Sequence, residues 1–475
     1  MEAKAKKIEK AVGGGQTAAW QNDRKHLLHP FAILPEFSDA GSRIFESGDG
    51  VFVQTEEGKR YIDGIGGLWC VNIGYNRPEM AEVIAEQVTK LPYYNTFTDM
   101  SSAPAAHLAA KLASLAPDSI NHAFFTCSGS ASNDTAVRLA HYYFDCLGMP
   151  KKQKVIARVN GYHGSTFLAA SLTGIVANHS GFNVLSGSPD SLVHFISEPN
   201  NYRRPDAQSE EDFCNDLIRE LEAKIEELGA DSVACFIAEP IMGAGGVIVA
   251  PRGYHARAKA VCSKHHILYI SDEVVTAFGR LGEFFASEAV FDVVPDIITT
   301  AKGISSGYIP LGATLFSDQI FETISQPRVA GQPFSHGFTY SGHPVACAAA
   351  LKNIEIIENE GILEHVREVG PKFHENLKSL LNLDCVGDVR GSHFMLGIEF
   401  VRDKASKEGF PQGVAVGKRV ANYAYDAGLI ARNVGDYIIL SPPLIMTEAQ
   451  TETVVDVLRS AIKNTQRDLT NEGLR

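Results

Sequence analysis

Short apolar runs alternate with amphipathic segments along most of this chain. Between the runs lie segments such as RPEMAEVIAEQVTKL (77–91), whose apolar residues recur at helical spacing. Strands and helices that alternate in this way predict a mostly parallel sheet with helices on both faces. The predicted strands are rich in branched or aromatic residues: HAFFTC, KVIARV, LVHFIS, SVACFIAE, HILYISDE and DIITTA.

The 475 residues are too many for one ordinary domain, and the pattern predicts two lobes. An early segment, GVFVQTEEGKRYIDGIGG, alternates around a Glu-Gly turn and predicts a β-hairpin. A long helical stretch, HPVACAAALKNIEIIENEGILEHV, precedes shorter mixed elements and a final helix opening on Thr447, a good N-cap. We predict a small lobe from residues 1–70 and 336–475 and a large lobe from 71–335. We expect about 20 residues at the N-terminus to be mobile.

Composition restricts the partners and the compartment. With 45% hydrophobic and 21% charged residues and 42 glycines, the chain is typical of a large soluble enzyme. Its net charge of −13 argues against nucleic acid or an anionic membrane as a partner. No secretory signal or membrane-spanning run is evident, and eight scattered cysteines fit a reducing cytoplasm. Cys262, His265 and His266 lack a second ligand pair, so we expect no metal site.

Two charged residues occupy the ends of neighbouring predicted strands, where open α/β sheets bind ligands. Lys302, in TTAKGISSG, follows an apolar run and precedes glycine and serine, which is typical of a half-buried lysine. Asp272 ends another apolar run, where an unpaired carboxylate would be costly. Its partner could be an internal arginine such as Arg280, the ring nitrogen of a cofactor, or Lys302 in a structural salt bridge.

Other strand ends supply an anion site and ring-covering groups. In FFTCSGSASNDTAVRLAHYY, a strand, a turn and a helix start place the amides of Gly129 and Ser130 for an anion, although Ser130 could be only an N-cap. Tyr162 and His163 follow a further strand, as does Glu239. A lysine, an acid, an aromatic and an anion-binding helix start together match pyridoxal phosphate. The GAGG after Met242 has no helix behind it, which argues against a nicotinamide-binding turn.

Three spaced motifs, DEVVTAFGRLG, PDIITTAKGISSGYIPLGA and GFTYSGHPVACAAAL, resemble class III aminotransferases, which are fold-type I enzymes that depend on pyridoxal phosphate. The resemblance runs from about His29 to the C-terminus. The segments GLWCVNIGY, LPYYNTF, YHGST and ARNVGDYIILSPPL resemble the ω-amino acid or amine:pyruvate transaminase branch. The resemblance implies an α/β fold with a seven-stranded, mostly parallel sheet between helices and a smaller α+β domain from both chain ends.

The resemblance also implies residue roles. Lys302 resembles the Schiff-base lysine and Asp272 the partner of the pyridine nitrogen. Further cofactor contacts are implied for Gly129, Ser130, Tyr162, His163, Glu239 and Val274. Phe338 and Thr339 resemble residues that reach the phosphate of the other subunit, which implies a homodimer and leaves a tetramer open. Phe31, Trp69, Tyr162 and Arg432 resemble substrate-binding residues, and Phe97 is a further candidate for the pocket or for the subunit interface.

Two departures from the family pattern stand near the site. Ala131 replaces a common glutamate after the phosphate-loop serine, with consequences for loop rigidity or cofactor retention, and Met242 replaces a frequent glutamine, which affects pocket polarity. We predict ping-pong transfer of an amino group from a primary amine, an ω- or β-amino acid or a diamine to pyruvate or a related keto acid. An aminomutase or decarboxylase of the same fold, and a non-catalytic amine sensor, are the alternatives.

Overall fold

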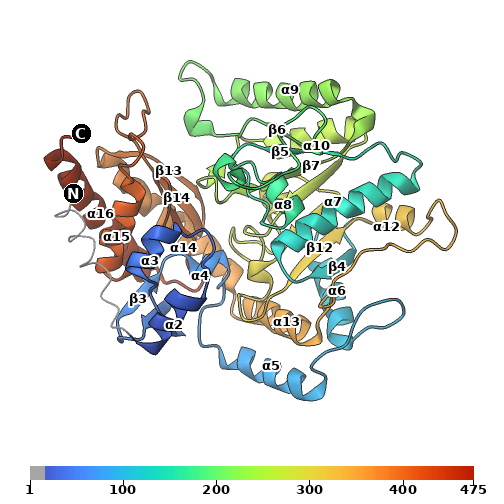
Figure 1. Cartoon of the computed structure of the whole chain (residues 1–475), viewed down its shortest axis with the longest axis horizontal. Coiled ribbons are helices and arrows are strands. Elements are labelled where there is room, and N and C mark those ends of the chain that lie inside the picture. The colour runs from blue at the N-terminus through green and yellow to red at the C-terminus, as the bar shows by residue number, and fades with distance from the viewer. Residues whose placement is uncertain (1–16, 475) are drawn as a thin grey trace.

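The computed structural model describes residues 17–474 of the chain. Two lobes lie side by side, one around a large central sheet and one in which N-terminal and C-terminal segments pack together (Figure 1). Of the stretch expected to be mobile, residues 1–16 lie outside the described part, and a helix, α2 (Ala18–His26), begins within the rest. Within residues 17–474, no helix combines the length and the apolarity needed to cross a bilayer.

The large lobe contains a seven-stranded sheet in the order β4-β12-β11-β10-β7-β5-β6. From β11 to β6 all neighbours are parallel, whereas β12 runs antiparallel to both β11 and β4. The six strands predicted from apolar runs are confirmed, and β12 is an addition to them. The strands are β4 (His122–Thr126), β5 (Lys154–Arg158), β6 (Val193–Ile196), β7 (Val233–Ala238), β10 (Leu268–Asp272), β11 (Ile297–Thr300) and β12 (Gly312–Phe316).

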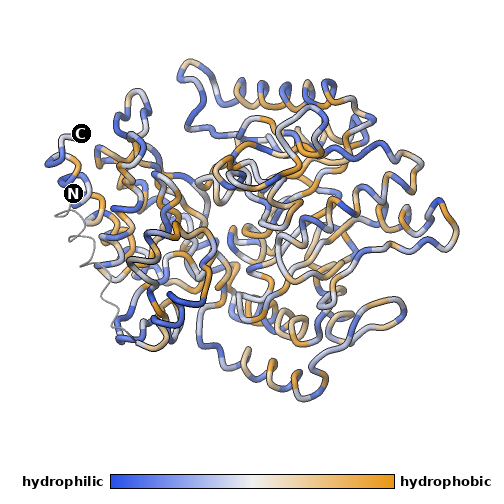
Figure 2. The backbone as a smooth tube through the Cα atoms, viewed as in Figure 1, coloured by the Kyte–Doolittle hydropathy of each residue, from blue (hydrophilic) through white to orange (hydrophobic). Residues whose placement is uncertain are grey.

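Helices cover both faces of this sheet, as predicted. On one face α7 packs against residues that include Val155 and Ile270, and on the other α9 and α10 pack against Ile156 and Phe236. In Figure 2 the strands are largely apolar and the helices change from apolar to polar along each turn. The helices and small hairpin are α5 (Pro78–Lys90), α6 (Ala103–Leu115), α7 (Gly129–Cys146), α8 (Phe167–Leu172), α9 (Glu210–Leu228), α10 (Tyr254–Lys264), α11 (Ala286–Phe291), α12 (Asp318–Ile324), α13 (Pro344–Asn359), β8 (Ile241–Met242) and β9 (Ile248–Val249).

The small lobe joins the two ends of the described chain. One sheet has the order β1-β2-β3-β15 and the other β13-β14-β17-β16, so strands from before residue 70 and after residue 420 share a sheet. The lobe boundaries at residues 70 and 335 stay predictions. The elements are α3 (Leu34–Ala40), β1 (Phe45–Asp49), β2 (Phe52–Thr55), β3 (Arg60–Asp63), α4 (Gly66–Trp69), α14 (Ile362–Lys378), β13 (Val386–Ser392), β14 (Met395–Phe400), α15 (Val416–Asp426), β15 (Leu429–Ile430), β16 (Arg432–Val434), β17 (Tyr437–Leu440) and α16 (Glu448–Asn471).

Three local predictions can be compared with this lobe. The early hairpin is confirmed, since β2 and β3 pair antiparallel around a turn at Gly58, whose φ is +82°. The final helix is also confirmed, and Thr447 caps it in a capping box with Gln450. The long helical stretch after His343 is wrong as one element, because Gly361 at φ +61° separates α13 from α14.

Candidate active site

Lys302 is the first residue of a 3₁₀ turn, η4 (Lys302–Ile304), that follows β11. Parallel pairing of β10 with β11 sets Asp272 opposite Thr299, so both strands end at the same edge of the sheet. The Lys302 backbone has φ +44°, and the Asn353 amide donates to the carbonyls of the next two residues at 2.9 and 3.0 Å. Burial lowers the pKa of Lys302, which favours the neutral amine.

The Asp272 carboxylate is buried and held by three groups. Its Oδ2 accepts from Asn133 Nδ2 at 2.8 Å and lies 2.7 Å from His163 Nδ1. Its Oδ1 accepts from the backbone amide of Val274 at 3.1 Å. The Thr299 hydroxyl donates to Asn133 Oδ1 at 2.7 Å and so fixes which way that amide faces. These contacts fix the orientation of the carboxylate before any ligand binds.

The two protein partners considered for Asp272 from the sequence are wrong. Arg280 donates instead to Asn72 and to the carbonyls of Phe394 and Pro442. Across the described residues, Lys302 and Asp272 form no ion pair, and the ionisable partner of Asp272 is His163. The carboxylate therefore has no cationic lysine or arginine of its own.

The turn before α7 presents free backbone amides. Ser128, not Ser130, is the N-cap, and its hydroxyl accepts from the amide of Ala131 at 3.2 Å. The amides of Gly129 and Ser130 donate to no residue within 17–474, and the helix dipole favours an anion there. A Cβ on Gly129 would lie 3.0 Å from both Val274 methyl carbons, so the absence of a side chain lets α7 begin this close to the end of β10.

Glu239 connects two segments beside this turn. It is buried, and its Oε1 accepts from the Tyr162 amide at 3.0 Å while its Oε2 accepts from the Gly243 amide at 2.8 Å. Burial raises its pKa. The Tyr162 hydroxyl lies 3.1 Å from Ser165 Oγ. Glu239 thus positions the backbone that carries Tyr162 and His163.

Trp69 joins the small lobe to the lysine. Its ring centroid lies 5.9 Å from Lys302 Nζ and 5.5 Å from Arg432 Cζ, and the side chain is only 5% exposed. A Cβ on Gly243 would approach the ring to 2.6 Å, so the indole packs directly on that backbone. Burial lowers the pKa of Arg432. The guanidinium of Arg432, the indole of Trp69 and the amine of Lys302 therefore meet at one place, from β16, α4 and η4.

Four candidates lie apart from this cluster. Phe31, between α2 and α3, is 70% exposed and takes no part in the ring contacts at Trp69. Phe97 is 48% exposed and would contact a Cβ on Gly337 at 3.2 Å, beside Phe338 and Thr339. Phe338 is half-buried and Thr339 exposed. Phe97 therefore lies on the surface next to the loop that carries Phe338 and Thr339, and Phe31 is exposed elsewhere in the chain.

The sequence analysis missed Asn133, which contacts Asp272 directly. It follows Gly129 by four residues, so helical spacing places it one turn below the anion site, facing the sheet. Of the two departures, Ala131 is 4% exposed and Met242 is fully buried. The helix start is closed by Ser128, so it forms without the glutamate that is common in the family. The effects of both departures on the cofactor and substrate stay predictions.

The donor set fits pyridoxal phosphate. Lys302 supplies an amine, Asp272 a fixed carboxylate, the α7 start free amides, and Tyr162 an aromatic ring. Within the described part of the chain, no group of three or more His, Cys, Asp or Glu side chains is placed to hold a metal ion. The individual roles of these residues stay predictions.

The family model for aminotransferase class-III matches residues 37–462. This chain is a class-III aminotransferase. Enzymes of this class depend on pyridoxal phosphate, which agrees with the donor set above. The matched residues include both lobes and all of the clustered site residues.

Named relatives cover nearly the whole aminotransferase. It is 40% identical over 457 residues to the putrescine–pyruvate aminotransferase of Pseudomonas aeruginosa, covering 96% of this chain and 98% of that protein. It is 40% identical over 443 residues to the mitochondrial γ-aminobutyrate transaminase 1 of Oryza sativa subsp. indica, covering 93% and 85%. Among solved structures, an (S)-enantioselective ω-transaminase from Thermomicrobium roseum matches with a TM-score of 0.90 and 41% identity, covering 95% of this chain and 100% of that one. The ω-transaminase from Pseudomonas jessenii in complex with PMP matches with a TM-score of 0.92 and 38% identity, covering 95% and 99%. These matches show the fold-type I transaminase fold predicted above.

Proposed function

We propose that this aminotransferase is an ω-transaminase that moves an amino group from a primary amine, an ω- or β-amino acid or a diamine to pyruvate or a related keto acid by a ping-pong mechanism. The observation that carries the proposal is the placement of Lys302 and Arg432 at 5.9 and 5.5 Å from the same Trp69 ring. An arginine beside the reactive lysine suits the carboxylate of a keto acid. The relatives named for putrescine–pyruvate and γ-aminobutyrate transamination support donors whose amine lies away from a carboxylate.

When bound, pyridoxal phosphate supplies an aldehyde that joins covalently to amines and a ring that withdraws electrons from the carbon losing its proton. Lys302 Nζ is the group that takes a proton from the substrate carbon and later returns one. For this the amine must be neutral part of the time, and its lowered pKa favours that state. The η4 turn, fixed by Asn353, keeps Nζ at the strand end.

Asp272 and Arg432 are the residues we propose for the charged groups of the cofactor ring and of the keto acid. The Asp272 carboxylate, oriented by His163, Asn133 and the Val274 amide, would pair with the ring nitrogen of the cofactor and favour its protonated form. Arg432 binds the carboxylate of the keto acid through two parallel hydrogen bonds. The Trp69 ring centroid lies 5.9 Å from Lys302 Nζ and 5.5 Å from Arg432 Cζ, so the ring would form an apolar wall beside the substrate.

We also propose that the active form is a homodimer with sites shared between subunits. Phe97, Phe338 and Thr339 gather on one surface of the chain away from its own Lys302. The Tyr93 hydroxyl donates to the Thr339 carbonyl at 2.7 Å and the Thr96 hydroxyl to the Ser341 carbonyl at 3.1 Å, so the two loops form one unit. The exposed aromatic side chains of these two loops suit burial against a second copy: Tyr93, Tyr94, Phe97 and Tyr340.

A cytoplasmic location remains our proposal. None of the eight cysteines, all of which lie within residues 17–474, forms a disulfide, which suits a reducing compartment. The rice relatives are named as mitochondrial proteins, so fractionation of the source cells is the test. Recovery of the protein with a membrane-enclosed organelle would contradict the proposal.

Alanine formation from pyruvate tests the function. Purified protein with pyridoxal phosphate is supplied with pyruvate and, in turn, a diamine, a β-amino acid, an ω-amino acid and a monoamine. We expect alanine and one equivalent of an aldehyde or ketone, without carbon dioxide, from at least one donor. Lys302→Ala is the control and should give none. Carbon dioxide release, an isomerised amine without keto acid, or no alanine from any donor would contradict the proposal.

A further inference from the structure

Trp69 is held in a conformation that its own residue type disfavours. Its φ is +62°, and it follows Gly66 at φ +55°, Gly67 at φ +67° and ψ −91°, and Leu68 at φ −135° and ψ +61°. A left-handed conformation costs a non-glycine residue about 1–2 kcal/mol, so other contacts must impose it. The cause of this turn therefore bears directly on where the indole ring lies.

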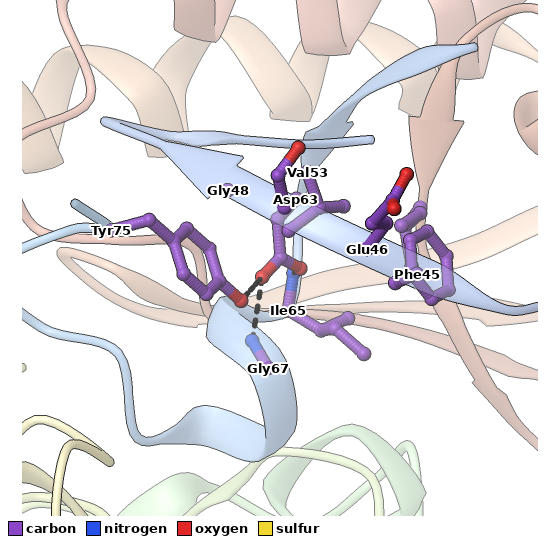
Figure 3. Close-up of a pocket in the computed structure, with 10 residues that line it drawn as sticks. Phe45, Glu46, Gly48, Val53, Asp63, Ile65, Gly67 and Tyr75 are labelled. Atoms are coloured by element: carbon purple, nitrogen blue, oxygen red, sulfur yellow. Dashed lines mark hydrogen bonds between the residues drawn. The ribbon is translucent and has the colours of Figure 1, made fainter. Parts of the chain in front are cut away.

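The Asp63 carboxylate, at the end of β3, is the group that imposes the turn. Its Oδ1 accepts from the Ile65 amide at 3.1 Å, and its Oδ2 accepts from the Gly67 amide and the Tyr75 hydroxyl, both at 2.6 Å (Figure 3). Asp63 is 2% exposed, and within residues 17–474 it forms no ion pair. Two of its three donors are backbone amides of the turn itself, so the carboxylate closes the loop that leads to Trp69.

One side of the turn borders a pocket. A pocket of about 450 Å³ borders Asp63, Ile65, Gly67 and Tyr75, and neither Trp69 nor Lys302 lines it. Figure 3 shows Tyr75 and Gly67 both directed at the Asp63 carboxylate from either side. Burial raises the pKa of Tyr75, so its hydroxyl keeps its proton and remains a donor. The hydrogen bonds to Asp63 therefore restrain the side of the turn that faces the pocket, in addition to the backbone bonds from Trp69 to Ile65 and from Cys70 to Gly66.

The strand that contains Asp63, β3, also pairs with the strand that precedes Arg432. β3 pairs with β15, and Asp63 is the partner of Ile430, two residues before Arg432. The Gly64 amide donates to the Ile430 carbonyl at 2.9 Å, so the chain on both sides of Asp63 is tied to the segment that carries the arginine. These are backbone contacts, so a change of the Asp63 side chain leaves the register of Arg432 in place, and the carboxylate itself bonds only to the turn amides and Tyr75.

We propose that Asp63, assisted by Tyr75, is a positioning residue that sets substrate discrimination by holding the Trp69 ring beside Lys302 and Arg432. This inference rests on the proposed function. Asp63 touches none of the reacting groups and acts only through the Gly66–Trp69 turn. Replacing it with asparagine substitutes a donor for one of the acceptor oxygens, so at least one turn amide loses its partner and the indole moves.

Fluorescence of the cofactor-free protein tests the positioning step without catalysis. The chain contains two tryptophans, so Trp20→Phe leaves Trp69 as the reporter. In that background we expect Asp63→Asn to shift the emission to longer wavelength and to increase quenching by acrylamide. Asp49→Asn is the matched control, because Asp49 lies in the same sheet with its side chain 72% exposed, and should change neither. Unchanged Trp69 emission in Asp63→Asn would overturn the proposal.

Kinetics test the consequence for discrimination. For the fastest aliphatic and the fastest aromatic donor of the wild-type protein, we expect Asp63→Asn to change the ratio of kcat/KM about tenfold. Tyr75→Phe keeps both hydrogen bonds from the turn amides to Asp63, so it should change this ratio less. It replaces Asp63→Asn as the test variant if Asp63→Asn does not fold. Combined with Trp69→Ala, Asp63→Asn should add nothing further. An unchanged kcat/KM ratio in Asp63→Asn, or full additivity of its effect with that of Trp69→Ala, would overturn this inference. Absence of transamination by the wild-type protein would instead overturn the proposed function.

Discussion

His163 Nδ1 lies 2.7 Å from Asp272 Oδ2, and both side chains are buried. The other ring nitrogen of His163 has no hydrogen-bond partner in the described part of the chain, so the imidazole is oriented chiefly by this contact. Asn133 donates to the same oxygen. The Asp272 carboxylate is therefore positioned by His163 and Asn133 rather than by a lysine or arginine of the described residues, which suits the predicted contact with a cationic ring nitrogen.

Replacing His163 should weaken cofactor binding. A hydrogen bond to a charged group contributes about 1.5–3 kcal/mol, so His163→Ala should raise the dissociation constant of pyridoxal phosphate about 10- to 100-fold. His163→Asn, whose amide can donate, should recover part of the loss. Titration of the cofactor-free protein, followed by visible absorption, measures both. Wild-type affinity in His163→Ala would mean that Asp272 does not depend on this contact.

A methyl group on Gly129 should push the α7 start away from the end of β10. The new Cβ would lie 3.0 Å from both Val274 methyl carbons and 3.6 Å from Ala301. Overpacking of this kind costs about 1–3 kcal/mol, so Gly129→Ala should lower cofactor affinity about tenfold. Gly409→Ala is the control, because nothing lies within 4 Å of its added Cβ. Equal affinities in the two variants would show that the α7 start does not contact the cofactor.

The lowered pKa of Lys302 should make the cofactor-free protein less stable as the pH falls. Between the folded pKa and the ordinary value near 10.5, the unfolded chain binds more protons than the folded one, so stability rises with pH across that window. Lys302→Met removes the titrating group. We expect its Tm to exceed that of the wild-type protein at pH 7 and the difference to shrink as the pH approaches 10.5. A Tm difference independent of pH would contradict a buried, neutral-favouring amine.

Arg432 should affect one half-reaction more than the other. Arg432→Met removes the cation proposed for the keto-acid carboxylate, a contact worth about 1.5–3 kcal/mol, so the KM for pyruvate should rise about 10- to 100-fold. The half-reaction with an uncharged monoamine should change little. Stopped-flow absorption separates the two. Equal losses in both halves would assign Arg432 to packing on Trp69 rather than to carboxylate binding.

Mixed dimers should show whether subunits share sites. Lys302→Ala lacks the reactive amine, and Thr339→Glu places a negative charge where the partner's phosphate is expected, so each variant alone should be inactive. In a mixed dimer one site carries both changes and the other neither, so random mixing should restore activity to about a quarter of the wild-type value. No recovery, in a mixture that mass measurement shows to contain mixed dimers, would mean that each chain completes its own site.

Six strands of the large lobe and the neighbouring positions of Lys302 and Asp272 could be predicted from the sequence. Apolar runs identified six strands, and the residues that end them include Lys302 and Asp272, because parallel strands bring their carboxyl ends to one edge. β12 was not identified, since GATLF is short and carries a glycine and a threonine. Its place depends on antiparallel pairing with β4 and β11, which are distant in sequence.

One local backbone conformation and two sets of long-range contacts explain the remaining differences. The break at Gly361 was missed because the helical periodicity continues on both sides of it, and only the φ of +61° separates the helices. Asn133 is an ordinary helix residue in the sequence, and its contact with Asp272 requires the α7 start to pack against β10. The turn at Trp69 depends on Asp63 and Tyr75, whose meeting depends on how the small lobe folds.

The visible absorption spectrum of the purified protein tests the central claim, that Lys302 carries the cofactor through both halves of a transamination. The spectrum is recorded with pyridoxal phosphate alone, after an amine is added without keto acid, and after pyruvate follows. The account predicts a yellow band that bleaches with the amine and returns with pyruvate, and no such cycle in Lys302→Ala. A protein that stays colourless with pyridoxal phosphate, or a band that the amine leaves unchanged for every class of donor, would contradict it.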